Sequence, residues 1–380
     1  MNNKILFFKR IARNLVLNIN KLFDIAYMFI PVKRTKNSVA LLEYAGIGDF
    51  LFNAVFIDKY IKYFSNKKVT LIVSELVYPI AIFLFNRYDN VTIIGINLRK
   101  FEYNFLYRYK MCYSLGKQEL LCCVHPNFTE QNLYIYNKIF SENYIRYEGE
   151  PYFYPLLQSK VKNEKVILSK YEKSNKNILY HLSQIYNYIT DSNSNISLLK
   201  NDMESLFSSY LYPKPDVKLP NKYAVILTDG SVPERKFSLK QWQSLLNMLP
   251  KEINIIQLGK SELPLEHINL INLINKTTLV ESMSIIKNAN FVIGNETGLT
   301  HFAYLNKIFT VVILGGGHYG RFLPLPFDFY IEPVIYNMDC FECGWHCDKI
   351  DTNDLNQYPC IENISTNNII EVLKIKGFLK

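Results

Sequence analysis

The stretch that decides the fold is Phe291-Val292-Ile293-Gly294-Asn295-Glu296-Thr297-Gly298-Leu299-Thr300-His301. Its first four residues are apolar or small and predict a buried strand, and the apolar-periodic run that begins at His301 predicts a helix. A strand that turns sharply into a helix presents backbone N–H groups and the positive end of a helix dipole, which suits a phosphate group. Glu296 falls at the strand's carboxyl end, where open α/β sheets bind ligands, and Thr297 and His301 share one face of the first helical turn. The alternative is a polar helix entry in which His301 is a half-buried core residue.

Short β-branched or aliphatic runs alternate with helix-period stretches in two series along the chain. This alternation predicts parallel sheets built from βαβ units, and hence an α/β fold of two Rossmann-like domains that face a central cleft. Residues 160–215 do not show this alternation, and the turn at residues 212–215 marks the boundary between the two domains. We therefore expect an arm at residues 1–37, a first domain at 38–215 and a second at 216–380. The predicted strands are Val39–Leu42, Val69–Val73, Val91–Ile96 and Leu120–Val124, then Tyr223–Leu227, Ile253–Leu258, Phe291–Gly294 and Phe309–Leu314, with helices at Leu239–Leu249 and Leu279–Lys287.

The positive charge of the chain is concentrated near its beginning. The 380 residues carry a net charge of +9, and residues 1–40 hold eight Lys and Arg residues against Asp24 alone, a net +7. Apolar residues recur there at helical spacing, and a basic helix with an apolar face is typical of a protein that lies on an anionic membrane surface. The apolar run is too short to cross a bilayer and lacks a signal-peptide pattern, so we expect a cytoplasmic protein peripheral to the inner membrane. A helix packed on the protein's own body is the alternative.

Three further stretches follow predicted strands in the same way. In the first, Gly46 and Gly48 permit a tight turn before Asp49, whose carboxylate either acts in chemistry or simply caps a helix. These residues do not match the dinucleotide-binding motif Gly-x-Gly-x-x-Gly, because Leu51 occupies the position of its third glycine. The other two stretches supply Ser231, Arg235 and Lys236, which suit a diphosphate unless they are ordinary loop cations, and Glu262, which suits a ribose diol.

Four of the seven cysteines cluster near the end of the chain. Their spacing of two, three and twelve intervening residues is compatible with a tetrahedral structural zinc site. His346 is an alternative ligand for the same ion. Thiols that stabilise a loop without metal are the alternative. The four are Cys340, Cys343, Cys347 and Cys360.

Taken in order, these stretches resemble the heptosyltransferases of glycosyltransferase family 9. The similarity covers residues 38–60 and 223–375 and consists of four motifs in sequence. They are Gly-x-Gly-Asp at 46–49, Arg-x-Phe-x(4)-Trp at 235–242, Leu-x-x-Lys-Thr-Thr-Leu at 273–279 and Asn-Glu-Thr-Gly-x-x-His at 295–301.

This resemblance implies a GT-B fold and an inverting transfer of a sugar, usually from ADP-heptose, onto a lipopolysaccharide-type acceptor, with no metal or other cofactor required for catalysis. Asp49 falls on the proposed catalytic base, and Arg235 falls where the family usually has a lysine that contacts the diphosphate. The turn that binds the donor sugar and its phosphate in this family corresponds to Glu296, Thr297, Gly298 and His301. Glu262 lies near the position of the family's ribose-binding carboxylate. Gly48 and Arg321, the latter in a glycine-rich loop at another strand end, are expected to contact acceptor or phosphate.

The chain departs from the family pattern at Glu43, where a basic residue is usual, at Phe237-Ser238, where Trp-Pro is usual, and in its long basic arm. These departures leave open the donor sugar and the acceptor, which is a glycolipid or glycan of lipopolysaccharide, O-antigen or capsule type. Two other classes are alternatives: a non-catalytic sugar-nucleotide-binding protein, and a zinc-stabilised nucleic-acid-binding protein. The second is disfavoured because no basic and aromatic face accompanies the cysteines, so we expect no nucleic-acid partner.

Overall fold

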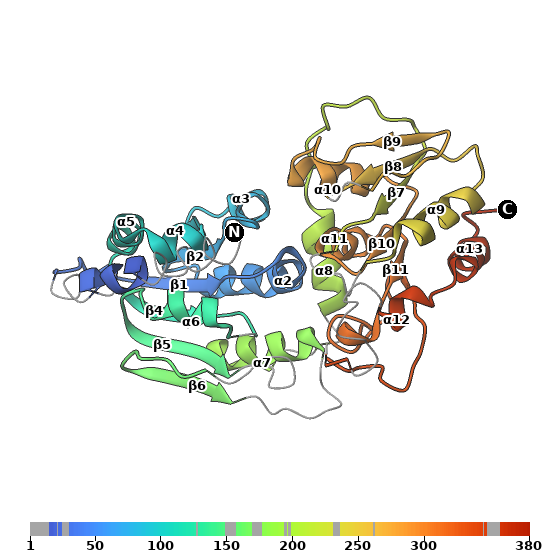
Figure 1. Cartoon of the computed structure of the whole chain (residues 1–380). Coiled ribbons are helices and arrows are strands. Elements are labelled where there is room, and N and C mark those ends of the chain that lie inside the picture. The colour runs from blue at the N-terminus through green and yellow to red at the C-terminus, as the bar shows by residue number, and fades with distance from the viewer. Residues whose placement is uncertain are drawn as a thin grey trace. The chain divides into compact units, whose positions relative to one another are not determined.

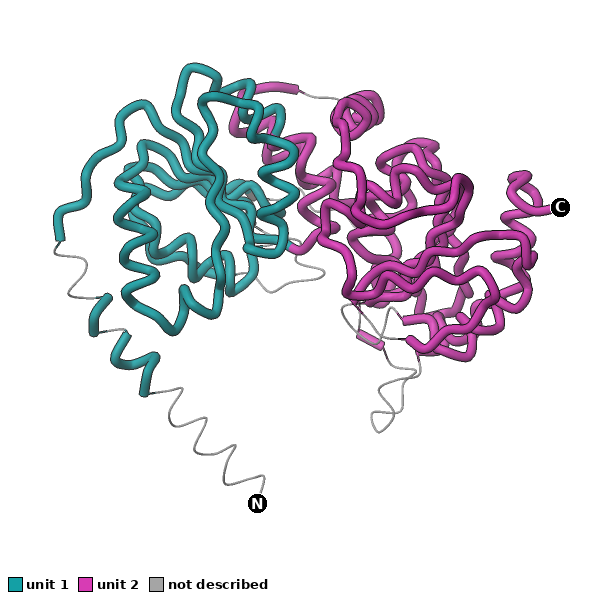
Figure 2. Tube along the Cα trace, turned by 90° about the horizontal axis from the view of Figure 1, so that it is seen from above, with its two compact units in different colours: residues 1–45, 58–170 teal, residues 46–57, 171–380 magenta. Residues whose placement is uncertain are grey.

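The computed structural model describes residues 15–20, 22–24, 30–126, 128–148, 157–168, 177–193, 196, 199–230, 236–260, 263–344, 346–347 and 358–380. The chain divides into two compact units, coloured separately in Figure 2. Unit 1 comprises residues 1–45 and 58–170, and unit 2 comprises residues 46–57 and 171–380. Two segments that the sequence analysis assigned to the first domain, 46–57 and 171–215, therefore group with unit 2.

Unit 1 is built on a parallel sheet with the strand order β3-β2-β1-β4-β5-β6 among the described residues. The central strand β1 is buried along its whole length, as expected for a parallel sheet covered on both faces. The strands are β1 (Ser38–Glu43), β2 (Lys68–Ser74), β3 (Val91–Ile96), β4 (Gln118–Cys123), β5 (Ser141–Glu148) and β6 (Glu164–Leu168).

The helices that follow these strands supply the core of unit 1. Side chains of α4, α5 and α6 pack with β1, β2 and β4 in one buried apolar cluster. The helix α2 begins in the residues grouped with unit 2 and ends in unit 1. These helices are α2 (Ile47–Tyr63), α3 (Tyr78–Phe85), α4 (Leu98–Tyr103), α5 (Phe105–Leu115) and α6 (Glu130–Tyr136).

Unit 2 contains a second parallel sheet, in which the described strands follow the order β12-β11-β10-β7-β8-β9. Its middle strands β10, β7 and β11 are buried throughout. The strands are β7 (Ala224–Leu227), β8 (Ile255–Leu258), β9 (Leu270–Asn272), β10 (Phe291–Asn295), β11 (Thr310–Ile313) and β12 (Ile331–Val334).

Helices cover both faces of this sheet. Figure 1 shows α9 and α13 on one side and α10 and α11 on the other. Trp242 of α9 and Leu373 of α13 join β7, β10 and β11 in one core, and capping boxes at Ser238 and Thr278 fix the starts of α9 and α10. The remaining elements are α7 (Ile178–Thr190), α8 (Leu199–Ser208), α9 (Leu239–Met248), α10 (Leu279–Lys287), α11 (Gly298–Leu305), the 3-10 turn η3 (Gly316–His318), α12 (Pro359–Glu362) and α13 (Thr366–Ile375).

The predicted fold class is confirmed, since both units are α/β structures with parallel sheets. Each of the eight predicted strands is present to within a few residues, and the helix predicted at Leu279–Lys287 has those bounds. The sequence analysis missed β5, β6, β9 and β12, and it missed α7 and α8 in the stretch without rhythm.

Candidate functional site

Asn295, the last residue of β10, is hydrogen-bonded to both ends of the loop that follows β7. Its Nδ2 donates to the carbonyl oxygens of Thr228 at 2.8 Å and Asp229 at 3.0 Å, and its Oδ1 accepts from the backbone of Phe237 at 3.2 Å. The Asp229 carboxylate in turn accepts from the backbone N–H of Lys260 at 2.7 Å. The residues that flank the basic loop are thus fixed at the edge of the sheet where α/β proteins bind ligands.

The helix α11 begins just beyond β10, as the sequence predicts. Thr297 is extended at its N-cap position, and no side chain caps this described helix. The Thr297 hydroxyl lies 3.1 Å from that of Thr300, which donates to the Asn295 carbonyl at 2.6 Å. Because side chains do not occupy the first turn, its N–H groups and dipole suit an anion.

Two glycines let the first residues of α2 approach the start of α11 closely. A Cβ atom on Gly298 would lie 2.5 Å from the Cβ of Ile47 and 3.0 Å from the backbone nitrogen of Gly48. A Cβ atom on Gly48 would lie 2.9 Å from the His301 ring. Only glycine permits this packing, which brings the Gly-x-Gly-Asp turn and the Asn-Glu-Thr-Gly turn together within unit 2.

A buried carboxylate, Glu296, lies between two histidines. His301 Nε2 is 2.8 Å from its Oε1, and His318 Nδ1 is 3.1 Å from its Oε2. The second ring nitrogen of His301 lies 2.6 Å from the hydroxyl of Tyr304. Burial, together with the Glu296 charge, raises the pKa of Tyr304 well above its usual range, so this phenol stays protonated. An ionised carboxylate only accepts hydrogen bonds, so both rings donate to Glu296 when it is ionised.

Asp49 lies in the first turn of α2 and contacts a buried arginine. Arg321 Nη2 donates to Asp49 Oδ1 at 2.6 Å, and the arginine side chain is 2% exposed, whereas that of Asp49 is 24% exposed. The Arg321 guanidinium also lies 4.4 Å from the centre of the Phe322 ring, and Phe322 packs against His301 with ring centres 4.7 Å apart. The Asp49 and Glu296 groups are therefore parts of one cluster.

A third histidine lies near this cluster. His181 is buried in α7, whose first residue donates its backbone N–H to the Arg321 carbonyl at 2.8 Å. Burial and, to a lesser extent, the Arg321 charge lower the pKa of His181 to about 4. The ring is therefore neutral at pH 7 beside a permanent cation.

Most of the predicted site residues that the structure describes are brought together. Asp49, Gly48, Arg321, Glu296, Gly298, Thr297 and His301 lie in the cluster or on its border. Lys236 is exposed just before α9 and makes no described contact with the cluster. Ser231, Arg235 and Glu262 lie outside the described residues.

The sequence analysis gave no role to His318, His181 or Asn295. One signal was available for His318, because it precedes Arg321 by three positions in the glycine-rich loop that follows β11. His181 gave no signal, since it lies in a stretch that carries no motif.

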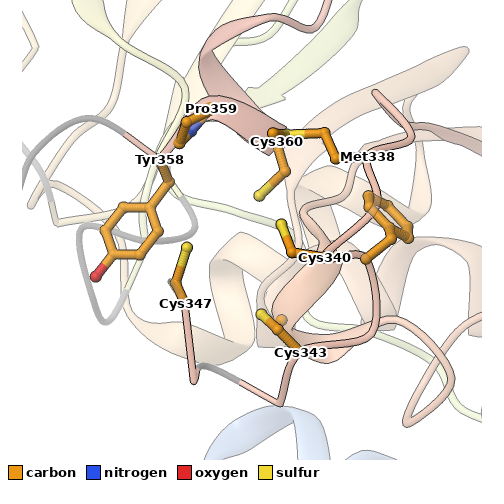
Figure 3. A pocket seen from close by; sticks show the side chains of 10 residues that line it. Met338, Cys340, Cys343, Cys347, Tyr358, Pro359 and Cys360 are labelled. Carbon is orange, nitrogen blue, oxygen red and sulfur yellow. The ribbon is translucent and has the colours of Figure 1, made fainter. Parts of the chain in front are cut away.

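The four predicted metal-ligand cysteines line one pocket at the C-terminal end of unit 2 (Figure 3). Burial raises the pKa of the Cys360 thiol, and the nearby sulfurs of Cys343, Cys347 and Cys340 raise it further. Within the described part of the chain, no three His, Cys, Asp or Glu side chains are spaced as ligands of a bound ion.

Of the basic arm, residues 15–20, 22–24 and 30–37 are described, and the first two of these stretches are helical. Two residues of the arm contact helices of unit 1 and the residues that follow them: Asp24 pairs with Arg108 at 2.7 Å and with Lys138 at 2.6 Å, and the Phe23 ring stacks on Phe105. Large apolar side chains on the arm are nevertheless exposed, and Leu106 of the neighbouring helix α5 is exposed as well. Those of the arm are Leu15, Val16, Ile19, Leu22 and Phe23. No described helix combines the length and apolarity needed to cross a bilayer.

Comparisons with known proteins give similarity of fold. No protein-family model and no curated protein sequence matches the chain. An E. coli heptosyltransferase solved with ADP is 12% identical, with a TM-score of 0.54 over 90% of this chain and 98% of that chain. A family 9 glycosyl transferase from Veillonella parvula is 14% identical, with a TM-score of 0.56 over 91% and 98%. The E. coli ADP-heptose lipopolysaccharide heptosyltransferase II is 12% identical, with a TM-score of 0.56 over 89% and 98%.

Proposed function

We propose that the chain is an inverting, metal-independent glycosyltransferase that moves a sugar, heptose, from ADP-heptose onto an acceptor of lipopolysaccharide, O-antigen or capsule type. The observation that carries this proposal is the partly exposed Asp49 carboxylate, which a buried arginine holds beside the uncapped start of α11. Structures of similar fold add support, since one E. coli heptosyltransferase was solved with ADP and again with a fluorinated ADP-heptose.

In the proposed reaction, the acceptor hydroxyl oxygen attacks the anomeric carbon of the donor sugar. A new carbon–oxygen bond forms while the bond to the diphosphate breaks, and that electron pair leaves with the diphosphate. Asp49 accepts the hydroxyl proton as general base. Attack from the side opposite the leaving group inverts the anomeric centre.

The leaving diphosphate gains negative charge, which the proposed donor site balances. The start of α11, with Thr297 and Gly298, supplies N–H donors, and Lys236 with Ser231 and Arg235 supplies further donors and positive charge. Glu262 is assigned to the ribose. Cations and a helix terminus make a divalent metal unnecessary for this step, and the sequence contains no Asp-x-Asp motif.

In this proposal Glu296 and His301 shape the donor-sugar pocket as one unit. The carboxylate is fixed by His301 and His318, so its orientation toward a sugar hydroxyl is set before the donor binds. Gly48 keeps the first turn close to His301, where a larger residue would clash with the ring.

We also infer that the protein works on an anionic membrane surface, at the cytoplasmic face of the inner membrane. The exposed apolar residues of the arm and the net +7 of residues 1–40 support this location. A glycolipid acceptor would be presented at the same surface.

The test is transfer by wild type and by Asp49→Asn, measured with donors chosen from a binding screen of ADP-, GDP- and UDP-sugars. We expect the variant to lose at least about 100-fold in kcat, because a general base contributes that much, while its donor affinity stays unchanged. Asp89→Asn, which alters an exposed carboxylate outside the cluster, serves as the control. If the variant turned over like wild type, Asp49 would not be the base. Donor binding without transfer by wild type would instead favour a sugar-nucleotide-binding protein.

A further inference from the structure

The described helical stretches of the arm contact the rest of unit 1 through polar groups and one aromatic ring. Asn20 Nδ2 donates to the Glu102 carbonyl at 3.2 Å, and Asp24 pairs with Arg108. Apolar side chains of the same stretches recur three or four residues apart, as on the buried face of a helix, yet they are exposed. They include Leu15, Ile19 and Leu22. The arm therefore presents an apolar stripe that the described part of unit 1 does not cover.

The helix α5 carries a second set of exposed side chains next to the arm. Leu106 and Tyr113 are 56% and 43% exposed, and together with the exposed Lys110 they recur at helical spacing along the outer face of the helix. Phe105, the neighbour of Leu106, stacks on Phe23 of the arm with ring centres 4.3 Å apart. The arm and α5 are therefore adjoining parts of one surface.

This surface also holds the positive charge of the protein. Residues 98–115, which span α4 and α5, contain four Lys and Arg residues against Glu102 alone, a net +3, and residues 1–40 carry +7. The whole chain carries +9, so its remaining residues are close to neutral, at −1. Exposed basic side chains and exposed apolar side chains thus share the same two segments of unit 1.

The surface begins at the edge of the sheet where the strands of unit 1 end. Asn97 directly follows β3, and its backbone N–H donates to the hydroxyl of Tyr107, in the first turn of α5, at 3.2 Å. Leu106 is the preceding residue of that turn. The apolar end of α5 therefore lies beside the carboxyl edge of the sheet, where open α/β proteins bind ligands.

We propose that α5 and the arm together form one face that binds an anionic phospholipid bilayer. Basic side chains would pair with lipid headgroups, Leu106 would enter the apolar layer, and Tyr113 would lie at the level of the headgroups, which tyrosine favours. A second copy of the chain suits this face less well, because two faces of the same positive charge repel each other. The assignment rests on the membrane location proposed above and not on sugar transfer. It sets the bilayer beside the edge of unit 1 that would receive a lipid-linked acceptor.

Sedimentation of the full chain with phosphatidylglycerol vesicles tests the role of α5 while the arm stays intact. Leu106→Ser combined with Tyr113→Ser should lower partitioning at least about fivefold, because both side chains lose their contact with the bilayer. Leu76→Ser combined with Tyr63→Ser is the matched control, since both of these side chains of unit 1 are 49% exposed. They belong to the loop before α3 and to α2, helices that contribute no residue to the described core cluster beneath α5. The control should partition like wild type, and vesicles of phosphatidylcholine alone should bind every variant weakly.

A second measurement reports the contact directly and leaves the face apolar. Leu106→Trp should be quenched by vesicles whose acyl chains carry bromine, beyond the quenching of the two native tryptophans in wild type, whereas Leu76→Trp should show no such excess. The assignment is overturned if Leu106→Trp shows no excess quenching or if the α5 variant partitions like its control. Loss of binding only when the arm residues are replaced would keep the membrane location and remove α5 from the face. A wild-type dimer that the α5 variant dissociates, with no vesicle binding by either, would overturn both and assign the face to a second copy.

Discussion

Glu296 is a carboxylate that the protein buries at a cost. A buried charge is tolerated only when it is paired and hydrogen-bonded, and here two histidine rings contact its two oxygens. The pairing also fixes the ring orientation of His301, whose other nitrogen meets the Tyr304 hydroxyl. This residue network is therefore rigid before any ligand arrives, which is what a pocket for a sugar requires.

Arg321 holds Asp49 in place, and we expect its loss to slow transfer without weakening donor binding. Arg321→Met should lower kcat by roughly 10- to 100-fold, because a misplaced catalytic group costs that much, and Arg321→Lys should restore part of it. The measurement is kcat and KM for the donor, together with donor affinity by calorimetry. Arg87→Met removes an arginine that pairs with Asp58 outside the cluster and should leave kcat unchanged. A rise in KM with normal kcat would show that Arg321 binds the donor instead.

His181 makes the stability of the protein depend on pH. Its pKa is about 4 in the folded chain against an ordinary value of 6.5. Between these values the unfolded state binds more protons, so the free energy of unfolding falls as pH falls from 6.5 toward 4. The loss from this residue alone should be about 2 to 3 kcal/mol at pH 4.5.

Urea unfolding of wild type and His181→Gln at pH 7 and pH 4.5 measures this contribution. The variant should lose less stability than wild type over the same interval, by that amount. His346→Gln, which alters an exposed histidine, should keep the wild-type dependence. Equal losses in wild type and His181→Gln would contradict the burial argument.

At the residue scale, sequence patterns indicated the side chains that follow predicted strands. Asp49, Glu296 and Arg321 were recognised because each lies just beyond an apolar run, and the structure places them in one cluster. The partners of these residues could not be found in this way. His318 reaches the cluster from the 3-10 turn η3, and His181 reaches it from α7, a helix that carries no motif. Only the packing of separate elements brings these two histidines to the cluster.

At the scale of elements, the start of α11 depends on Gly298. A methyl group there would meet the β-branched Ile47 and the backbone of Gly48, neither of which can rotate away. Gly298→Ala should therefore lower the free energy of unfolding by about 1 to 3 kcal/mol and weaken donor binding, because the helix start is displaced. Chemical denaturation and donor titration measure the two effects.

Gly46→Ala is the matched control for this substitution. It lies in the same turn, but its added Cβ would meet nothing nearer than Asp49 Oδ2 at 3.9 Å. If both variants were equally stable and bound donor equally well, the close approach of the two turns would not matter for the site.

Most strands in the middle of each sheet were predicted, with β5 as the exception, whereas of the four edge strands only β3 was predicted. Strands such as β1 and β10 are buried on both faces and therefore read as continuous apolar runs. The edge strands β6, β9 and β12 are short or half-buried, and β12 contains Pro333, which is tolerated only at an edge. Polar residues interrupt the continuous apolar run by which the central strands were recognised.

At the scale of the whole molecule, the charge is unevenly distributed. Residues 1–40 hold +7 of the net +9, while large apolar side chains of the arm stay exposed. Asp24 and Phe23 fix the arm on unit 1, so the apolar residues are presented on a structured surface. The contact with the body and the membrane role, which the sequence left as alternatives, are compatible with each other.

Removing the arm should reduce binding to anionic vesicles while donor binding survives. Deletion of residues 1–35 removes Asp24, however, and leaves Arg108 buried without this partner, which is strongly destabilising. Replacing Leu15, Ile19 and Leu22 together by Ser keeps that ion pair and is the sharper test. Each lost apolar contact with the bilayer weakens binding by about 1 kcal/mol or more, so partitioning should fall at least about tenfold.

Sedimentation with vesicles that contain phosphatidylglycerol measures this partitioning at low and high salt. The attraction between the basic arm and the lipid should weaken as salt screens it, while the apolar part persists. Replacing Leu211, Ile268 and Ile375 by Ser changes three apolar residues of unit 2 that are more exposed than those of the arm, and should leave partitioning intact. If the arm variant bound vesicles as tightly as this control, the exposed residues of the arm would not form a membrane-binding surface.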